Sequence, residues 1–158
     1  VAGAQIRKLG RIVAHMRASK RRIKAALKGA PGLSFRRTND EAGDTGCFLI
    51  LLLEDAAAAQ RVVARLRETG PGGTRLAEYG LHIYYNVPQL VRKVPLSPAG
   101  NPWSLPANAG SVYAYGRGAC PLSDALFDRA VLIPIPSCLT RRQEEDGAKL
   151  IRAAIEGG

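Results

Sequence analysis

Between Tyr115 and Pro136 the chain reads YGRGACPLSDALFDRAVLIPIP, which combines a loop, a helix start and an apolar strand. Its two glycines allow backbone conformations that are closed to other residues, and Pro121 prevents a helix from running through it. Ser123 fits a helix N-cap, and Leu122 and Phe127 have the spacing of a hydrophobic staple around that cap. We therefore predict a glycine-rich loop followed by a short helix that begins at Ser123.

A buried strand and a second helix follow this loop. Residues 131–133 are Val-Leu-Ile, a run of strand length that two prolines close. Thr140 and Gln143 fit a capping box, and the acidic residues after them suit the first turn of a helix. One apolar stripe runs along this helix to Gly157: Ala148, Leu150, Ile151, Ala154 and Ile155. The rest of the chain must pack against this unit of loop, short helix, strand and terminal helix.

The start of the chain predicts a long amphipathic helix that ends near Gly29. Its apolar residues recur at three- and four-residue steps: Ile6, Leu9, Val13, Met16, Ile23 and Leu27. Lys20 interrupts this stripe, which indicates either an uncovered stretch or a partner that carries acid. A helix of about 25 residues is about 40 Å long, more than a small domain needs to cover its own sheet. We therefore expect part of the stripe to contact another chain or domain.

Almost all of the net charge lies in this first quarter of the chain. The protein has 23 basic and 13 acidic residues, and residues 1–39 hold 11 of the basic ones and none of the acidic ones. A basic helix suits phosphate groups of nucleic acids or nucleotide sugars, but it equally suits the solvated face of a connecting helix. The helix has no interleaved aromatic residues, which favours the solvated face.

Composition narrows the class of protein. A length of 158 residues with 46% hydrophobic residues is typical of one globular domain. No apolar run approaches the ~20 residues of a membrane span, and no signal peptide opens the sequence. The three cysteines contain no CxxC pair: Cys47, Cys120 and Cys138. They fit a reducing cytoplasm better than disulfides or zinc, so we expect a cytoplasmic protein without a metal site.

The middle of the chain predicts a strand, a helix and another strand. Residues 47–53 form an unbroken apolar run, typical of a strand that is covered on both faces. Asp55 opens a helix that ends at Gly70 and turns one apolar face inward: Ala59, Val62, Val63 and Leu66. Residues 81–85 alternate and predict a further strand, with His82 and Tyr84 on one face. Together these elements predict an α/β domain.

Residues 86–112 are the least regular part, with five prolines and the only tryptophan. A loop this long within a compact domain is usually functional or disordered. Trp103 would either contact a partner or ligand, or cover the edge of the core.

The pattern G-x-G-x-C-P-x-S-D-A-L-x-x-R-A-V-x-I-P-I, with its Thr-capped terminal helix, resembles the C-terminal segment of the DegT/StrS-type aminotransferases. These are pyridoxal-phosphate enzymes of fold type I that act largely on keto-sugars and related cyclic ketones. Residues 4–13 resemble the helix that links the large and small domains of that family. Weaker similarity runs through residues 47–50, 66–70 and 82–84.

The resemblance implies that residues 1–158 form a single small domain, with a linking helix at 1–29 and an α/β part at 30–158. We expect a small mixed or antiparallel sheet covered by long N- and C-terminal helices. The cofactor-binding domain of the family, with its Schiff-base lysine, would precede Val1. None of the six lysines stands in the Ser-x-His-Lys-like context that the family uses. Pyridoxal phosphate would therefore belong to the assembled enzyme, and this chain would supply neither catalytic nor cofactor-binding residues.

Six residues are candidates for substrate binding: Tyr84, Tyr85, Asn86, Trp103, Arg117 and His82. Phenol and amide groups bind sugar hydroxyls, an indole stacks on the apolar face of a ring, and a guanidinium pairs with phosphate or carboxylate. Two of these residues also have an interpretation without a ligand. His82 suits a structural position on a strand, and a loop arginine such as Arg117 is usually solvated.

Three functions remain open. In the first, the chain is a subunit or fragment of a sugar-type aminotransferase, in sugar or antibiotic biosynthesis, that completes an active site whose Schiff-base lysine is on another chain. It would then be inactive alone and would need a cofactor-binding large domain or a full-length relative as partner. In the second, it is a non-catalytic interaction or regulatory domain derived from that scaffold. In the third, which the sequence favours least, it is a basic nucleic-acid-binding module.

Overall fold

The computed structural model describes residues 2–97, 100–110 and 112–157. Their strands form one antiparallel sheet in the order β1-β2-β4-β3. The strands are β1 (Ser34–Phe35), β2 (Phe48–Leu52), β3 (Thr74–Arg75) and β4 (Ala130–Pro134). The two central strands pair from Phe48 opposite Pro134 to Leu52 opposite Ala130. The sheet is thus antiparallel, one of the two arrangements that the sequence predicts.

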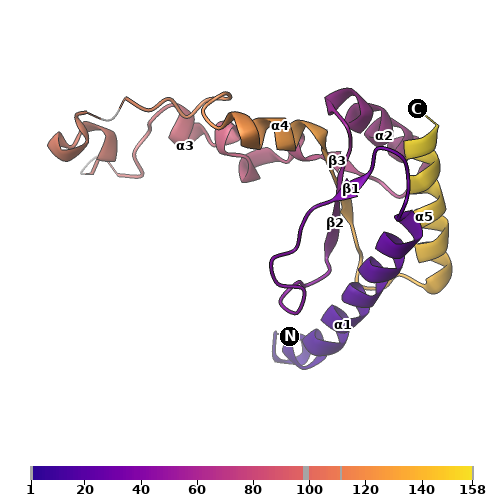
Figure 1. Ribbon diagram of the computed structural model, residues 1–158. Coiled ribbons are helices and arrows are strands. Elements are labelled where there is room, and N and C mark those ends of the chain that lie inside the picture. The colour runs from indigo at the N-terminus through magenta and orange to yellow at the C-terminus, as the bar shows by residue number, and fades with distance from the viewer. Residues whose placement is uncertain (1, 98–99, 111, 158) are drawn as a thin grey trace.

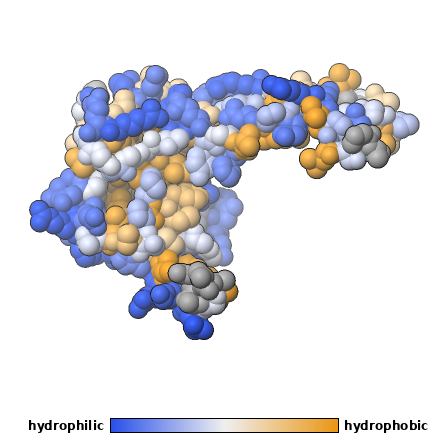
Figure 2. All heavy atoms as spheres, turned by 180° about the vertical axis from the view of Figure 1, so that it is seen from behind, coloured by the Kyte–Doolittle hydropathy of each residue, from blue (hydrophilic) through white to orange (hydrophobic). Residues whose placement is uncertain are grey.

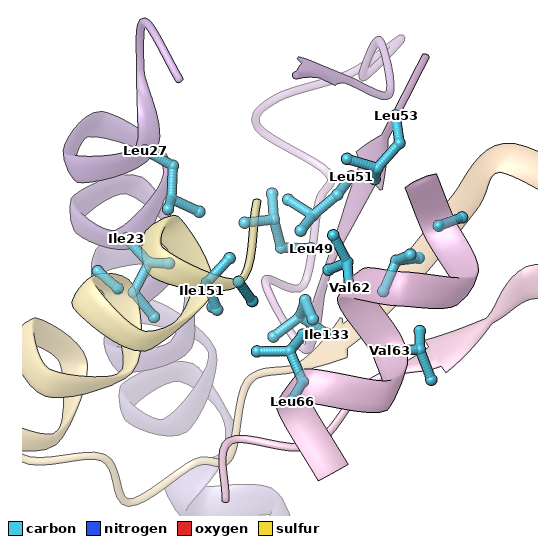
Figure 3. Close-up of a cluster of buried hydrophobic side chains, with 14 of the residues drawn as sticks. Ile23, Leu27, Leu49, Leu51, Leu53, Val62, Val63, Leu66, Ile133 and Ile151 are labelled. Carbon is cyan, nitrogen blue, oxygen red and sulfur yellow. The ribbon is translucent and has the colours of Figure 1, made fainter. Parts of the chain in front are cut away.

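Three long helices pack on one face of this sheet (Figure 1). They are α1 (Ala2–Leu27), α2 (Ala56–Thr69) and α5 (Arg141–Glu156). Alternate residues of the central strands point toward them and form the core with apolar side chains of the helices (Figure 3). The largest of these buried side chains include Leu51, Val131, Leu27, Leu66 and Ile151. The predicted α/β fold, with its sheet covered by the N- and C-terminal helices, is confirmed.

The second face of the sheet is also apolar but lies outside this core. Phe48, Ile50 and Leu52 point there from β2, since their neighbours 49 and 51 point to the helices. Ile50 is buried, whereas Phe48 and Leu52 are only half-buried. The prediction that both faces of this strand are covered therefore holds only in part.

Local signals place α2 and α5 where the sequence predicts them. The Asp55 carboxylate accepts a hydrogen bond from the Ala58 amide at 2.7 Å, and Gly70 ends α2 at a φ of 106°. All four residues predicted to face inward on α2 are buried. Thr140 and Gln143 form the reciprocal capping box of α5.

The start of the short helix differs from the prediction. Helix α4 (Pro121–Arg129) begins at Pro121, so Ser123 lies inside its first turn and is not the N-cap. Leu122 is 88% exposed, which excludes the predicted staple with Phe127. A proline disrupts a helix only on its own N-terminal side, because its ring clashes with the preceding turn. At the first helical position its fixed φ is favourable, and its missing N–H would be unpaired in any case.

The strand predicted at 81–85 does not form. Two 3₁₀ turns, η2 (Gly80–His82) and η3 (Tyr84–Asn86), replace it, so His82 and Tyr84 do not share a face of a strand. Gly80 turns the chain at a φ of 57°, and its carbonyl accepts a hydrogen bond from the Asn86 side chain at 3.1 Å. The strand that follows α2 in the sheet is β3, which pairs with β4.

The described residues between 76 and 120 (76–97, 100–110 and 112–120), which we call the arm, project away from the core and return to it (Figure 1). The arm contains α3 (Pro88–Val91) and a series of 3₁₀ turns, including η1 (Leu76–Glu78), η4 (Pro102–Ser104) and η5 (Pro106–Asn108). The segment predicted to be irregular, 86–112, makes up most of it. Within the described part of the chain, no helix has the length and apolar character that a membrane span requires.

Helix α1 is covered over only part of its length. Ile23 and Leu27 are buried in the core, whereas Ile6 and Leu9 are 69% and 54% exposed. Lys20 pairs with Asp44 of the loop before β2 at 2.6 Å. The acid that faces this lysine therefore belongs to the chain itself.

Candidate functional site

The base of the arm is tied to the first turn of α4. Asp124 is buried there, at 7% exposure. One of its carboxylate oxygens accepts a hydrogen bond from the Tyr84 hydroxyl at 2.8 Å, and the other accepts one from the Gly118 amide at 2.7 Å. The Tyr84 hydroxyl in turn accepts a hydrogen bond from the Cys120 amide at 3.1 Å. We call these four residues the clasp, because they join the outgoing and returning segments of the arm.

The clasp uses both functions of the Tyr84 hydroxyl, as donor and as acceptor. Removal from water raises the pKa of Tyr84, and the hydrogen bond to the Asp124 carboxylate raises it further. The hydroxyl is therefore neutral at physiological pH. The sequence did not single out Asp124, because an acidic residue in a first helical turn is ordinary and only the folded arm buries this one.

Arg117 lies beside the clasp and is paired but accessible. Its guanidinium donates a hydrogen bond to the Asp128 carboxylate at 2.5 Å and lies over the Tyr85 ring, 5.5 Å from the centroid. The hydrogen bond with Asp128 raises the pKa of Arg117. Its side chain is 54% exposed, so a phosphate or carboxylate could reach it only in competition with Asp128.

The other two candidates near the base shape its turns. The Asn86 side chain donates to the Gly80 carbonyl, as described above, and the His82 ring stacks on Tyr79 with centroids 4.8 Å apart. The rings of Tyr84 and Tyr85 meet edge to face at 5.1 Å. Five of the six predicted residues therefore gather around the base of the arm.

Trp103 belongs to a separate place on the arm. It lies in η4, and η4 and η5 form the outer end of the arm, away from α4 (Figure 1). The Trp103 ring meets Tyr115 edge to face, with centroids 6.5 Å apart. A hollow of about 180 Å³ opens here between Pro102, Trp103, Asn108, Tyr113 and Tyr115. The six predicted residues are thus divided between two places, and their role in substrate binding stays a prediction.

The described residues do not fit pyridoxal phosphate, which needs a lysine amine and groups that hold its phosphate and ring nitrogen. Lys20 is paired with Asp44, and Lys24 lies over the Phe35 ring at 5.4 Å from its centroid. The remaining lysines are exposed on the surface: Lys8, Lys28, Lys93 and Lys149. None of them lines the base of the arm or the hollow. Nor do the described ranges contain a group of three or more His, Cys, Asp or Glu residues that could hold a metal ion.

Comparison with known proteins relates the whole chain to part of a larger enzyme. No protein-family model matches the sequence. Among solved structures, the aminotransferase TlmJ from Streptoalloteichus hindustanus matches with a TM-score of 0.63 and 20% sequence identity. The match covers 98% of this chain and 35% of TlmJ, so the chain spans about a third of the length of that enzyme. At this identity the likeness shows the fold, which is that of one part of an aminotransferase.

Proposed function

We propose that this chain is the small domain of a pyridoxal-phosphate-dependent aminotransferase that acts on a keto-sugar or a related cyclic ketone. It completes an active site whose Schiff-base lysine is on another chain. The observation that carries the proposal is the match to TlmJ, which extends along 98% of the chain and involves only 35% of the enzyme. The motif at 116–135, which resembles the C-terminal segment of sugar aminotransferases, supports the same assignment.

The exposed apolar side chains of the arm support a partner domain. The large hydrophobic residues that the described chain exposes lie mostly on the arm and α4: Tyr79, Leu81, Val91, Val94, Leu96, Leu105, Val112, Tyr113, Leu122 and Leu126. Figure 2 shows hydrophobic side chains along the arm. A surface of this kind is costly in water and is typical of contact with another protein. In the proposed enzyme, that protein is the cofactor-binding large domain.

The residues of this chain would bind and orient the sugar. Pyridoxal phosphate, held by the large domain, would supply the electron sink for amino transfer. At the base of the arm, Tyr85 and Asn86 would provide hydrogen bonds to hydroxyl groups, and Tyr84 would accept one with the lone pair that the clasp leaves free. Trp103 would provide an apolar ring face at the separate outer end of the arm. Arg117 would pair with a phosphate or carboxylate of the substrate in exchange for Asp128. His82 is the remaining candidate contact in this group.

A chimera tests the proposal. This chain would replace the segment of TlmJ that it matches, and TlmJ without that segment would serve as the negative control. We expect the chimera to recover the absorbance change of bound cofactor on addition of an amino donor, and amino transfer to a keto-sugar. A chimera that folds and binds the cofactor but transfers no amino group to any keto-sugar would contradict the proposal. So would turnover by the purified chain with free pyridoxal phosphate and an amino donor.

A pair of variants tests the role of the arm in the same chimera. Leu96 is 98% exposed on the arm, and we expect Leu96→Asp to loosen the contact with the large domain and to lower the activity. Ala153→Asp, on the exposed face of α5, is the matched control and should leave the activity unchanged. Equal effects of the two substitutions would show that the arm does not contact the large domain.

The same exposed arm also suits the second function, a non-catalytic domain that binds a full-length relative. In that case the chain would associate with the intact aminotransferase and change its stability or regulation, while no chimera would be active. Titration of the purified chain into intact TlmJ, followed by sedimentation and by the rate of amino transfer, separates the two functions.

A further inference from the structure

The outer end of the arm is held in one conformation by prolines and by side-chain hydrogen bonds. Two prolines open consecutive 3₁₀ turns, η4 and η5, and fix their first dihedral angles. The Asn101 side chain accepts a hydrogen bond from the Trp103 amide at 3.1 Å. The Asn108 side chain donates to the Pro102 carbonyl at 2.6 Å and so joins the two turns. These bonds hold the Trp103 backbone in place at the wall of the hollow.

The lining of the hollow is aromatic and uncharged. Three rings, a proline and an amide surround it, and the five lining residues include no ionisable acid or base of the Asp, Glu, Lys, Arg or His type. Among the described residues, the Trp103 indole N–H and the hydroxyls of Tyr113 and Tyr115 have no hydrogen-bond partner. The hollow therefore combines apolar ring faces with unused donors and acceptors at their edges.

We propose that this hollow binds the ring of a neutral sugar. Trp103 and Tyr115 would contact the C–H face of the ring, and the hydroxyl of Tyr113 and the side chain of Asn108 would bind the hydroxyl groups on its rim. The inference rests on the proposed function and deepens it. It places a separate site for a sugar ring at the outer end of the arm, apart from the groups at the base, and it adds three residues that the sequence did not single out.

The chemistry of the lining favours a sugar over other ligands. A phosphate or carboxylate would lose water without gaining a charged partner, which is costly. An apolar side chain of a partner protein would fill the hollow but would bury the phenol and indole polar groups without partners. The volume of about 180 Å³ is below the ~300 Å³ at which pockets for drug-sized ligands begin, so the hollow fits a single ring better than a whole nucleotide.

The only tryptophan of the chain reports on binding, because Trp103 itself lines the hollow. The purified chain would be titrated with methyl hexopyranosides while the tryptophan emission is recorded, with cyclohexanol as an apolar ring that lacks the rim of hydroxyls. We expect a saturable change of emission with a glycoside and a weaker response to cyclohexanol. The absence of a saturable response to every glycoside overturns the inference. Tighter binding of cyclohexanol also overturns it, and indicates a docking site for an apolar side chain.

Variants test whether the change of tryptophan emission comes from binding in the hollow. Tyr115→Ala removes one ring of the lining and is expected to raise the Kd about 10-fold. Tyr113→Phe keeps the shape of the hollow and removes one hydroxyl, which should raise the Kd about 5-fold. Tyr79→Phe, on the arm but outside the hollow, is the matched control and should leave the Kd unchanged. An unchanged Kd in Tyr113→Phe and Tyr115→Ala overturns the assignment.

The result of the glycoside titration can be separated from the result of the chimera experiment that tests the proposed function. An active chimera whose small domain shows no response to glycosides would leave the aminotransferase proposal standing and reject this site. A saturable, Tyr115-dependent response in a chain whose chimera is inactive would retain the site and reject the aminotransferase role.

Discussion

At the scale of single residues, Glu144 is the least exposed charged group of the described chain. It is 3% exposed in α5 and faces α1, where one carboxylate oxygen accepts a hydrogen bond from the Ser19 hydroxyl at 2.6 Å. The Arg22 guanidinium donates to both oxygens at 2.5 Å. These hydrogen bonds from Arg22, and a further one from Ser19, outweigh the effect of burial and lower the pKa of Glu144 to about 2.

We predict that Glu144→Gln lowers the free energy of unfolding by about 2 kcal/mol at neutral pH, since it leaves Arg22 without its charged partner. This loss is smaller than the ~3–5 kcal/mol of a fully buried pair because the Arg22 side chain is 34% exposed. Urea unfolding measures the effect. Glu145→Gln, one residue along and exposed, is the control and should change little.

The same pair of proteins tests the pH dependence. Because the pKa of Glu144 is lower in the folded protein than its ordinary 4.5, its contribution is complete above about pH 4.5 and is lost as the pH falls toward 2. The difference in unfolding free energy between the wild type and Glu144→Gln should therefore shrink steadily over that range. A difference that stays constant down to pH 3 would show that the ion pair contributes nothing.

The clasp gives rise to a second prediction for a single residue, Tyr84. Tyr84→Phe keeps the ring but removes the hydroxyl that joins Asp124 to the Cys120 amide. We expect a loss of about 1 kcal/mol and faster amide hydrogen exchange at Gly118 and Cys120, because the returning segment of the arm is then held by fewer bonds. Tyr79→Phe serves as the control. Unchanged exchange at both amides would show that the clasp does not hold the arm.

At the scale of elements, the sequence predicted best where two local signals coincide. Helix α2 has a side-chain cap at Asp55 and a glycine end at Gly70, and α5 has a capping box, so their limits follow from neighbouring residues alone. The central strands are apolar runs whose residues are mostly buried. A mixed or antiparallel sheet under helical cover was expected from the resemblance, and the structure shows the antiparallel arrangement with that cover.

The errors arise where one local pattern fits two conformations. The alternation at 81–85 suits a strand, yet Ile83 is the only buried residue among these five, and turns around Gly80 satisfy the backbone without a neighbouring strand. For the site, the sequence identified residue types but could not separate the base of the arm from its outer end. It also missed Asp124, because its burial depends on contacts between segments about 40 residues apart.

Two glycines give an element-scale prediction. A Cβ at Gly46 would lie 2.6 Å from the Arg17 nitrogen, so the loop before β2 touches the backbone of α1 directly. A Cβ at Gly70 would meet no atom within 4 Å, although φ is positive at both positions. We expect Gly70→Ala to cost about 1 kcal/mol for backbone strain alone, and Gly46→Ala to cost at least about 2 kcal/mol more. Thermal unfolding of the two variants measures the difference. Equal costs would contradict the close approach of the loop.

At the scale of the whole molecule, the chain divides into a packed core and two projecting parts, the arm and the N-terminal half of α1 (Figure 1). Both projecting parts expose apolar side chains. The projecting half of α1 also carries unpaired basic residues at Arg7, Lys8 and Arg11, within the described range. Such a helix is costly in water, and a partner surface that is apolar with acidic groups at its edge would complement it.

The last prediction separates the two halves of this helix. Ile6→Ser together with Leu9→Ser should leave the unfolding free energy within about 0.5 kcal/mol of the wild type, because both side chains are exposed. The same pair should weaken association with the large domain, measured by sedimentation of the separately produced domains, and added salt should weaken it further. Leu27→Ala is the contrasting control: Leu27 is fully buried at the other end of the same stripe, so its loss should cost about 3 kcal/mol or more in stability. If the wild-type chain remains a strict monomer at high concentration and binds no large domain, the exposed half of α1 is not an interface.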